Sequence, residues 1–215
     1  MNLHRLHMQG VPPVIAILRG VVPDEVIGIA EALVCAGVRI IEVPLNSPEP
    51  LESIRRLRQA LGEQALIGAG TVLSVEAVEA TYEAGARLIV TPNTDQAVIR
   101  QAVTRGMECM PGFFTPSEAF AAVAAGATRL KLFPAASSVP GHIRAIREVL
   151  PPATEIWAVG GTGAGNLAHW LEAGAAGIGV GSALYRRGDD AELVGTHARE
   201  LVAAWEAATL RRPGS

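Results

Sequence analysis

Residues 36–43, Ala36-Gly37-Val38-Arg39-Ile40-Ile41-Glu42-Val43, join the end of a helical stretch to a β-like run. Glycine at such a junction accepts the left-handed conformation that ends a helix, and the β-branched residues after it favour a strand. The same Ala-Gly junction recurs before three later β-like runs, at residues 84–85, 125–126 and 173–174. This recurrence predicts a chain built from a repeated strand-and-helix unit.

Eight β-like runs follow one another along the chain, and their starts are 20 to 27 residues apart. They cover residues 14–18, 38–43, 65–69, 87–90, 107–110, 128–133, 155–159 and 176–180. Amphipathic segments of helical period separate them, and a final helix is expected in residues 191–210. Eight such units predict a single-domain (β/α)8 TIM barrel over residues 13–210, whereas an open doubly wound sheet would more often have about five or six strands. We expect an N-terminal arm or short helix at residues 1–12 and a frayed tail at residues 211–215.

The composition argues against several classes of protein. The net charge of −3 leaves no positive surplus for binding nucleic acid or an anionic membrane. No run of about 20 apolar residues is present, so no membrane span is expected. Cys35 and Cys109 lie in apolar stretches of a chain without a signal peptide. This pattern predicts two buried, reduced thiols and a cytoplasmic location.

The most unusual basic residue is Lys131, the single lysine among 18 lysines and arginines. It lies in the apolar run Leu130-Lys131-Leu132-Phe133. If the two leucines face the helices, Lys131 and Phe133 face the barrel axis, and the same alternation in Ile40-Ile41-Glu42-Val43 directs Glu42 inward. An inward lysine and glutamate are costly to bury unless they pair or do chemistry. They form either a structural ion pair or an amine nucleophile with a carboxylate that moves protons.

A nucleophilic amine at position 131 requires a lowered pKa, because a free lysine with a pKa of about 10.4 is almost fully protonated at pH 7. The flanking leucines and a neighbouring arginine such as Arg129 would each disfavour the charged form. A neutral amine attacks a ketone and forms an iminium, which accepts the electrons of a breaking carbon–carbon bond. Glu42 would then act as base on a hydroxyl and as acid on the resulting enamine.

Small residues follow the last two predicted strands, as Gly160-Gly161 and Gly181-Ser182. Loops at these places in a barrel often bind a phosphate through backbone N–H groups, although simple tight turns would use the same residues. Residues 163–168 weakly match a dinucleotide fingerprint, but no acidic residue ends the next strand. The five histidines have no metal-ligand spacing and none stands at a strand end, so no metal site is expected.

The order and spacing of six motifs resemble the family of 2-keto-3-deoxy-6-phosphogluconate and 6-phosphogalactonate aldolases over residues 13–185. The motifs are IAILRG at 15–20, EVPLNS at 42–47, IGAGTV at 67–72, IVTPN at 89–93, LKLFP at 130–134 and AVGG at 158–161. The resemblance implies that Lys131 forms a Schiff base and that Glu42 is the general acid and base. It assigns the remaining contacts to three groups: Arg19 and Thr71 for the keto-acid end, Pro92 and Phe133 for the pocket wall, and Gly160, Gly161, Gly181 and Ser182 for the phosphate. It also implies a homotrimer that needs no cofactor and acts on a phosphorylated keto acid.

Asn46 and Val159 resemble the galactonate branch of this family, since the gluconate branch typically has arginine and threonine there. Valine cannot hydrogen-bond the C4 hydroxyl of the substrate, which favours cleavage of 2-dehydro-3-deoxy-6-phosphogalactonate to pyruvate and glyceraldehyde 3-phosphate. Phe113-Phe114 replaces smaller residues and is expected to narrow the pocket mouth or change its specificity. Three alternatives remain: the same cleavage of the gluconate epimer or of both epimers, a phosphosugar isomerase that uses Glu42 without an imine, and a non-catalytic binding barrel.

Overall fold

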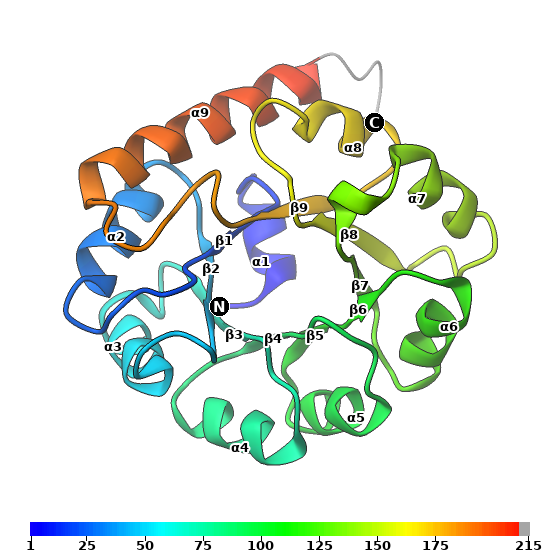
Figure 1. Ribbon diagram of the computed structural model, residues 1–215, viewed down its shortest axis with the longest axis horizontal. Helices are drawn as coiled ribbons and strands as arrows, with labels where there is room; N and C mark the ends of the chain where they lie inside the picture. The colour runs from blue at the N-terminus through cyan, green and yellow to red at the C-terminus, as the bar shows by residue number, and fades with distance from the viewer. Residues whose placement is uncertain (211–215) are drawn as a thin grey trace.

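The computed structural model describes residues 1–210 of the chain, and within them nine parallel strands form one sheet. The strands are β1 (Val14–Ile17), β2 (Ile40–Pro44), β3 (Leu66–Gly70), β4 (Leu88–Val90), β5 (Glu108–Met110), β6 (Gly112–Phe113), β7 (Arg129–Leu132), β8 (Glu155–Val159) and β9 (Gly177–Val180). β5 and β6 stand at the two ends of the sheet order and only Pro111 separates them in sequence, so the sheet closes into a ring (Figure 1). The predicted (β/α)8 barrel is confirmed, and the tail predicted at residues 211–215 lies outside the described residues.

Helices surround the ring of strands, and α1 lies inside the ring in a view down the barrel (Figure 1). The helices are α1 (Leu3–Met8), α2 (Val26–Cys35), α3 (Pro50–Leu61), α4 (Val75–Glu83), α5 (Gln96–Thr104), α6 (Pro116–Ala124), α7 (Pro140–Arg147), α8 (Leu167–Glu172) and α9 (Ala191–Leu210), with a 3-10 turn at Ala135–Ser137. No helix within residues 1–210 combines the length and the apolar character that crossing a bilayer would require.

The Ala-Gly junctions end their helices as predicted. Gly37 has a φ of 98°, its N–H donates to Val34, and the N–H of Val38 donates to the carbonyl of Leu33. This pair of hydrogen bonds satisfies the last carbonyls of α2 and turns the chain into β2. The glycines at 85, 126 and 174 have φ values of 102°, 104° and 96° and end α4, α6 and α8 in the same way.

Two hydrophobic cores lie on either side of the strands. The outer core joins the sheet to the helices and contains Leu130 and Leu132 of β7. The inner core fills the barrel, and Leu3 and Leu6 of α1 pack in it beside Trp157. α1 therefore closes the amino-terminal end of the barrel, and the carboxyl ends of the strands remain available for a site.

Two details of the sequence analysis are wrong. Gly112 and Phe113, expected in a loop after the fifth strand, form β6, because the strand resumes after Pro111 and pairs with β7. Cys35 is exposed because it is the last residue of α2 on the solvent side, whereas Cys109 is buried; both are free thiols. Burial raises the pKa of the Cys109 thiol to about 12.

Candidate active site

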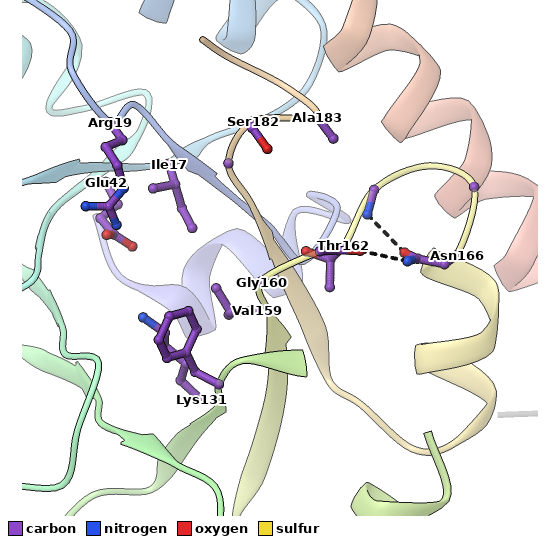
Figure 2. A pocket seen from close by; sticks show the side chains of 15 residues that line it. Ile17, Arg19, Glu42, Lys131, Val159, Gly160, Thr162, Asn166, Ser182 and Ala183 are labelled. Atoms are coloured by element: carbon purple, nitrogen blue, oxygen red, sulfur yellow. Dashed lines mark hydrogen bonds between the residues drawn. The ribbon is translucent and has the colours of Figure 1, made fainter. Parts of the chain in front are cut away.

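The carboxyl ends of β1, β2, β7, β8 and β9 surround a cavity of about 780 Å³ (Figure 2). Nine of the eleven residues singled out from the sequence line it: Arg19, Glu42, Lys131, Phe133, Val159, Gly160, Gly161, Gly181 and Ser182. These residues come from both halves of the chain, so only the closed barrel brings them together. The amine of Lys131 points toward the wall that carries Glu42 and Arg19 (Figure 2).

Lys131 is buried inside the barrel, with 6% of its surface exposed. Its neighbours Leu130 and Leu132 face the helices, so the predicted strand parity is confirmed. Its Nζ lies 4.5 Å from the centre of the Phe133 ring. Burial lowers the pKa of Lys131 below its ordinary value; the charge of Glu42 opposes this shift and that of Arg19 adds to it. The site thus favours the neutral amine that a nucleophile requires.

The arginine whose charge lowers the pKa of Lys131 is Arg19, and the prediction that Arg129 has this effect is wrong. Arg129 begins β7 at the opposite end of the barrel, where its guanidinium lies 2.7 Å from Glu108 and 2.9 Å from Glu155. Strand alternation places Arg129 and Lys131 on the same face of the strand but does not predict how far along the barrel axis each side chain lies. A step of two residues along a strand is about 6.6 Å, and two carboxylates neutralise the guanidinium there.

Glu42 is the second buried charged residue in the cavity, with 2% of its surface exposed. Burial raises the pKa of its carboxyl, against the lowering effect of Lys131 and then Arg19. Its Oε2 has no hydrogen-bond partner, and Glu42 and Lys131 are not within the 4.0 Å of an ion pair. Burial therefore moves both groups toward their neutral forms, an arrangement more useful for proton transfer than for a structural ion pair.

Gly70 provides the space in which the Glu42 carboxyl lies. A Cβ at position 70 would be 1.5 Å from Oε1 of Glu42 and 2.4 Å from its Cδ. In the pairing of β2 with β3, Ala69, which precedes Gly70, lies opposite Val43, which follows Glu42. The missing side chain of β3 thus determines where the carboxyl of β2 can lie.

A glycine-rich loop after β8 forms the other end of the cavity. Gly160 and Gly161 have φ values of 95° and 78°, which side chains other than glycine rarely adopt. The buried Thr162 hydroxyl donates to the carbonyl of Gly179 in β9 at 2.6 Å. Asn166 closes the loop with two hydrogen bonds (Figure 2).

Several lining residues were not singled out from the sequence, namely Ile17, Thr162, Gly163, Gly165, Asn166 and Ala183. Four of them lie in residues 160–166, the loop whose glycines also produced the weak dinucleotide match. That glycine spacing marks a loop that lines the cavity. The prediction that this loop binds no dinucleotide stays a prediction.

Comparison with known proteins places this geometry in a family. The family model for KDPG and KHG aldolases matches residues 5–194. The chain belongs to the KDPG and KHG aldolase family. It is 47% identical to the 2-dehydro-3-deoxy-6-phosphogalactonate aldolase of Escherichia coli over 91% of this chain and 96% of the relative. It is 49% identical to a probable 2-dehydro-3-deoxy-6-phosphogalactonate aldolase of Rhizobium meliloti, over 91% of this chain and 92% of the relative. A solved structure described as native KDPGal superposes with a TM-score of 0.91 at 47% identity, over 92% of this chain and 96% of that one.

The chain is accordingly an aldolase.

Hydrogen bonds join the loops after β1 and β2 at the side of the cavity that carries Glu42. The guanidinium of Arg19 donates to Asn46 Oδ1 at 2.5 Å, and the N–H of Gly20 donates to Ser47 Oγ at 2.9 Å. The loop after β2 therefore holds the loop after β1. These hydrogen bonds direct the positively charged guanidinium of Arg19 toward the wall beside Glu42.

Thr71 and Pro92 are the two predicted residues that do not line the cavity of the aldolase. Thr71 directly follows β3 with a φ of 56°, an uncommon conformation for a β-branched residue. Pro92 packs against β6, since a Cβ at Gly112 would lie 2.4 Å from the Pro92 carbonyl. Their proposed contacts with substrate stay predictions.

Phe113 and Phe114 do not narrow the cavity mouth. Phe113 is 2% exposed and packs in the outer core, because its β6 position pairs with Leu132, which also faces the helices. Phe114 stacks on the His142 ring at 5.6 Å between ring centres, and His142 Nε2 is 3.0 Å from the Phe114 carbonyl oxygen. The expectation that this pair alters specificity at the mouth is not supported by their positions.

Proposed function

We propose that this aldolase cleaves 2-dehydro-3-deoxy-6-phosphogalactonate through a Schiff base on Lys131. The observation that carries the proposal is a buried lysine of lowered pKa in a cavity shared with a buried glutamate. The substrate assignment rests on the two galactonate-aldolase relatives and on Val159, an apolar residue in the cavity wall.

The reaction begins when the neutral Lys131 amine attacks the C2 ketone and water leaves, giving an iminium. Arg19 and Thr71 hold the carboxylate end of the substrate, with Pro92 and Phe133 beside it. Glu42, directly or through a water molecule, takes the proton of the C4 hydroxyl. The C3–C4 bond breaks, its electron pair moves into the iminium to form an enamine, and glyceraldehyde 3-phosphate leaves.

Glu42 then returns its proton to C3 of the enamine, and addition of water to the iminium releases pyruvate and free Lys131. Formation of the iminium takes up one proton as water leaves and its hydrolysis releases that proton, and Glu42 receives one proton and gives it back, so protons balance over the cycle. A carboxyl with a raised pKa suits both steps, since it gains and loses a proton closer to neutral pH.

The phosphate end of the substrate would lie against the loops at Gly160, Gly161, Gly181 and Ser182, which line the cavity. Glycine allows a close approach of the backbone, and backbone N–H groups are good donors to phosphate oxygens.

Within residues 1–210 no group of three or more His, Cys, Asp or Glu is arranged to hold a metal ion. We assign the electron-accepting role to Lys131.

Reduction with borohydride in the presence of pyruvate tests the Schiff base directly. Peptide mass mapping is expected to find the reduced pyruvate adduct on the peptide that contains Lys131, with loss of activity. Lys131→Met supplies the control and is expected to be neither labelled nor active. Full retro-aldol activity after borohydride and pyruvate treatment would instead refute an imine at Lys131.

The epimer preference is tested by kcat/KM for the galactonate and gluconate substrates. A higher value for the gluconate epimer would refute the substrate assignment and leave the Schiff-base chemistry in place. We also propose a cytoplasmic homotrimer, as the family resemblance implies. Light scattering of the purified protein measures the oligomeric state, and a monomer at working concentration would contradict it.

A further inference from the structure

The loop after β8 contains four glycines among residues 160–165 and would have little conformational preference by itself. Two side chains tie it in place. Thr162 anchors its middle to β9 through the bond to Gly179, and Asn166 closes its end. A loop that binds an anion through backbone groups must hold those groups in one geometry before the ligand arrives.

Asn166 uses both ends of its side-chain amide inside the loop. Its Oδ1 accepts from the N–H of Gly163 at 3.0 Å, and its Nδ2 donates to the carbonyl of Gly161 at 2.9 Å (Figure 2). The backbone N–H groups of Asn166 and Leu167 return to the carbonyl of Gly163 at 3.2 Å and 3.0 Å. One residue therefore fixes two of the glycines and sets the direction of the peptide groups between them.

The loop also has a defined place relative to the reacting lysine. A Cβ on Gly160 would lie 3.3 Å from the Phe133 ring, and Lys131 Nζ lies 4.5 Å from the centre of the same ring. Asn166 itself lies farther along the loop, beyond the buried Thr162. Loss of its ties would loosen the far end of the cavity without moving the ring and the amine.

We infer that Asn166 is a positioning residue for the phosphate end of the substrate and is not required for imine formation at Lys131. This inference rests on the proposed function for the identity of the anion. It predicts that the two ends of the substrate respond differently to substitution of Asn166.

The test compares Asn166→Asp and Asn166→Ser with the wild-type aldolase. Aspartate keeps the acceptor for Gly163 but loses the donor to Gly161 and adds a negative charge near the bound anion; serine keeps at most one tie. Loss of one such hydrogen bond within the loop is expected to raise KM for the phosphorylated substrate roughly two- to tenfold, with kcat little changed. The rate of pyruvate trapping by borohydride is expected to equal that of the wild type.

Asn2→Asp is the matched control for the added charge. Asn2 accepts a hydrogen bond from the Arg5 N–H at the start of α1, at the opposite end of the barrel, and aspartate retains that acceptor. Its KM should remain at the wild-type value. Thermal unfolding of each variant establishes that the fold is intact.

An unchanged KM in both folded Asn166 variants would overturn the inference, as would a pyruvate trapping rate that falls in parallel with kcat/KM. Calorimetry with inorganic phosphate separates this inference from the proposed function. If the wild-type protein binds phosphate more tightly than Asn166→Asp but does not trap pyruvate, the inference stands and the Schiff-base proposal fails. Equal phosphate binding in the two proteins, or none in the wild type, counts against Asn166.

Discussion

Substitution of Gly70 by alanine tests whether the position of the Glu42 carboxyl controls catalysis. The φ of Gly70 lies outside the left-handed region, so the backbone itself accepts alanine. The new methyl carbon would lie 1.5 Å from Glu42 Oε1, whereas ordinary contact begins at 3.4 Å, so the carboxyl must move by about 2 Å. A misplacement of about 1 Å in an active site can cost 100-fold, and loss of a general acid and base costs about 100- to 10,000-fold.

We therefore expect Gly70→Ala to lower kcat/KM for the phosphorylated substrate by about 100-fold or more and to approach the loss caused by Glu42→Gln. Gly68→Ala is the matched control, because it adds a methyl group to the same strand, and the three atoms nearest to that methyl group, at 2.9–3.0 Å, all belong to Leu88. It should cost stability, measured by urea unfolding, more than activity per folded molecule. A folded Gly70→Ala enzyme with wild-type kcat/KM would refute the assignment of Glu42.

Further predictions concern charge, specificity and packing. Arg19→Leu removes a positive charge that lowers the pKa of Lys131, so the rise of pyruvate trapping with pH should shift to higher pH; an unchanged profile would mean that Arg19 does not affect the amine. Val159→Thr adds a hydroxyl to the cavity wall and is expected to shift the ratio of kcat/KM values toward the gluconate epimer by roughly two- to tenfold, the effect of one hydrogen bond. Phe113→Ala is expected to reduce the free energy of unfolding by about 3–5 kcal/mol in urea titrations and to leave the epimer ratio unchanged, since the ring lies in the outer core. A changed ratio of kcat/KM values would instead indicate that Phe113 contributes to the cavity mouth.

Alternation along a strand predicted the directions of Lys131 and Glu42 correctly, because side chains of a strand must point to opposite faces. It did not predict how deep along the axis each side chain lies, and for that reason Arg129 was wrongly placed near Lys131. Depth depends on where the strand starts relative to its neighbours, which is a property of the closed barrel.

Loops limited the remaining predictions. Phe113 was expected at the cavity mouth because Pro111 was taken to end a strand, yet the strand resumes and its parity turns the ring outward. The positive φ of Thr71 and the two hydrogen bonds of Asn166 depend on local backbone geometry that no periodicity reports. The substrate contacts of Thr71 and Pro92 remain predictions.

The burial of Lys131 has a practical consequence for labelling the protein. The chain has a single lysine, which is 6% exposed inside the barrel, and its other basic side chains besides histidine are arginines, which do not react with reagents that acylate amines. The residues ahead of α1 lie at the barrel end that α1 closes, opposite to the cavity. A lysine introduced ahead of α1 and acylated while pyruvate occupies Lys131 should thus attach a single dye or support at that end, giving a uniformly oriented enzyme whose substrate entrance faces the solution.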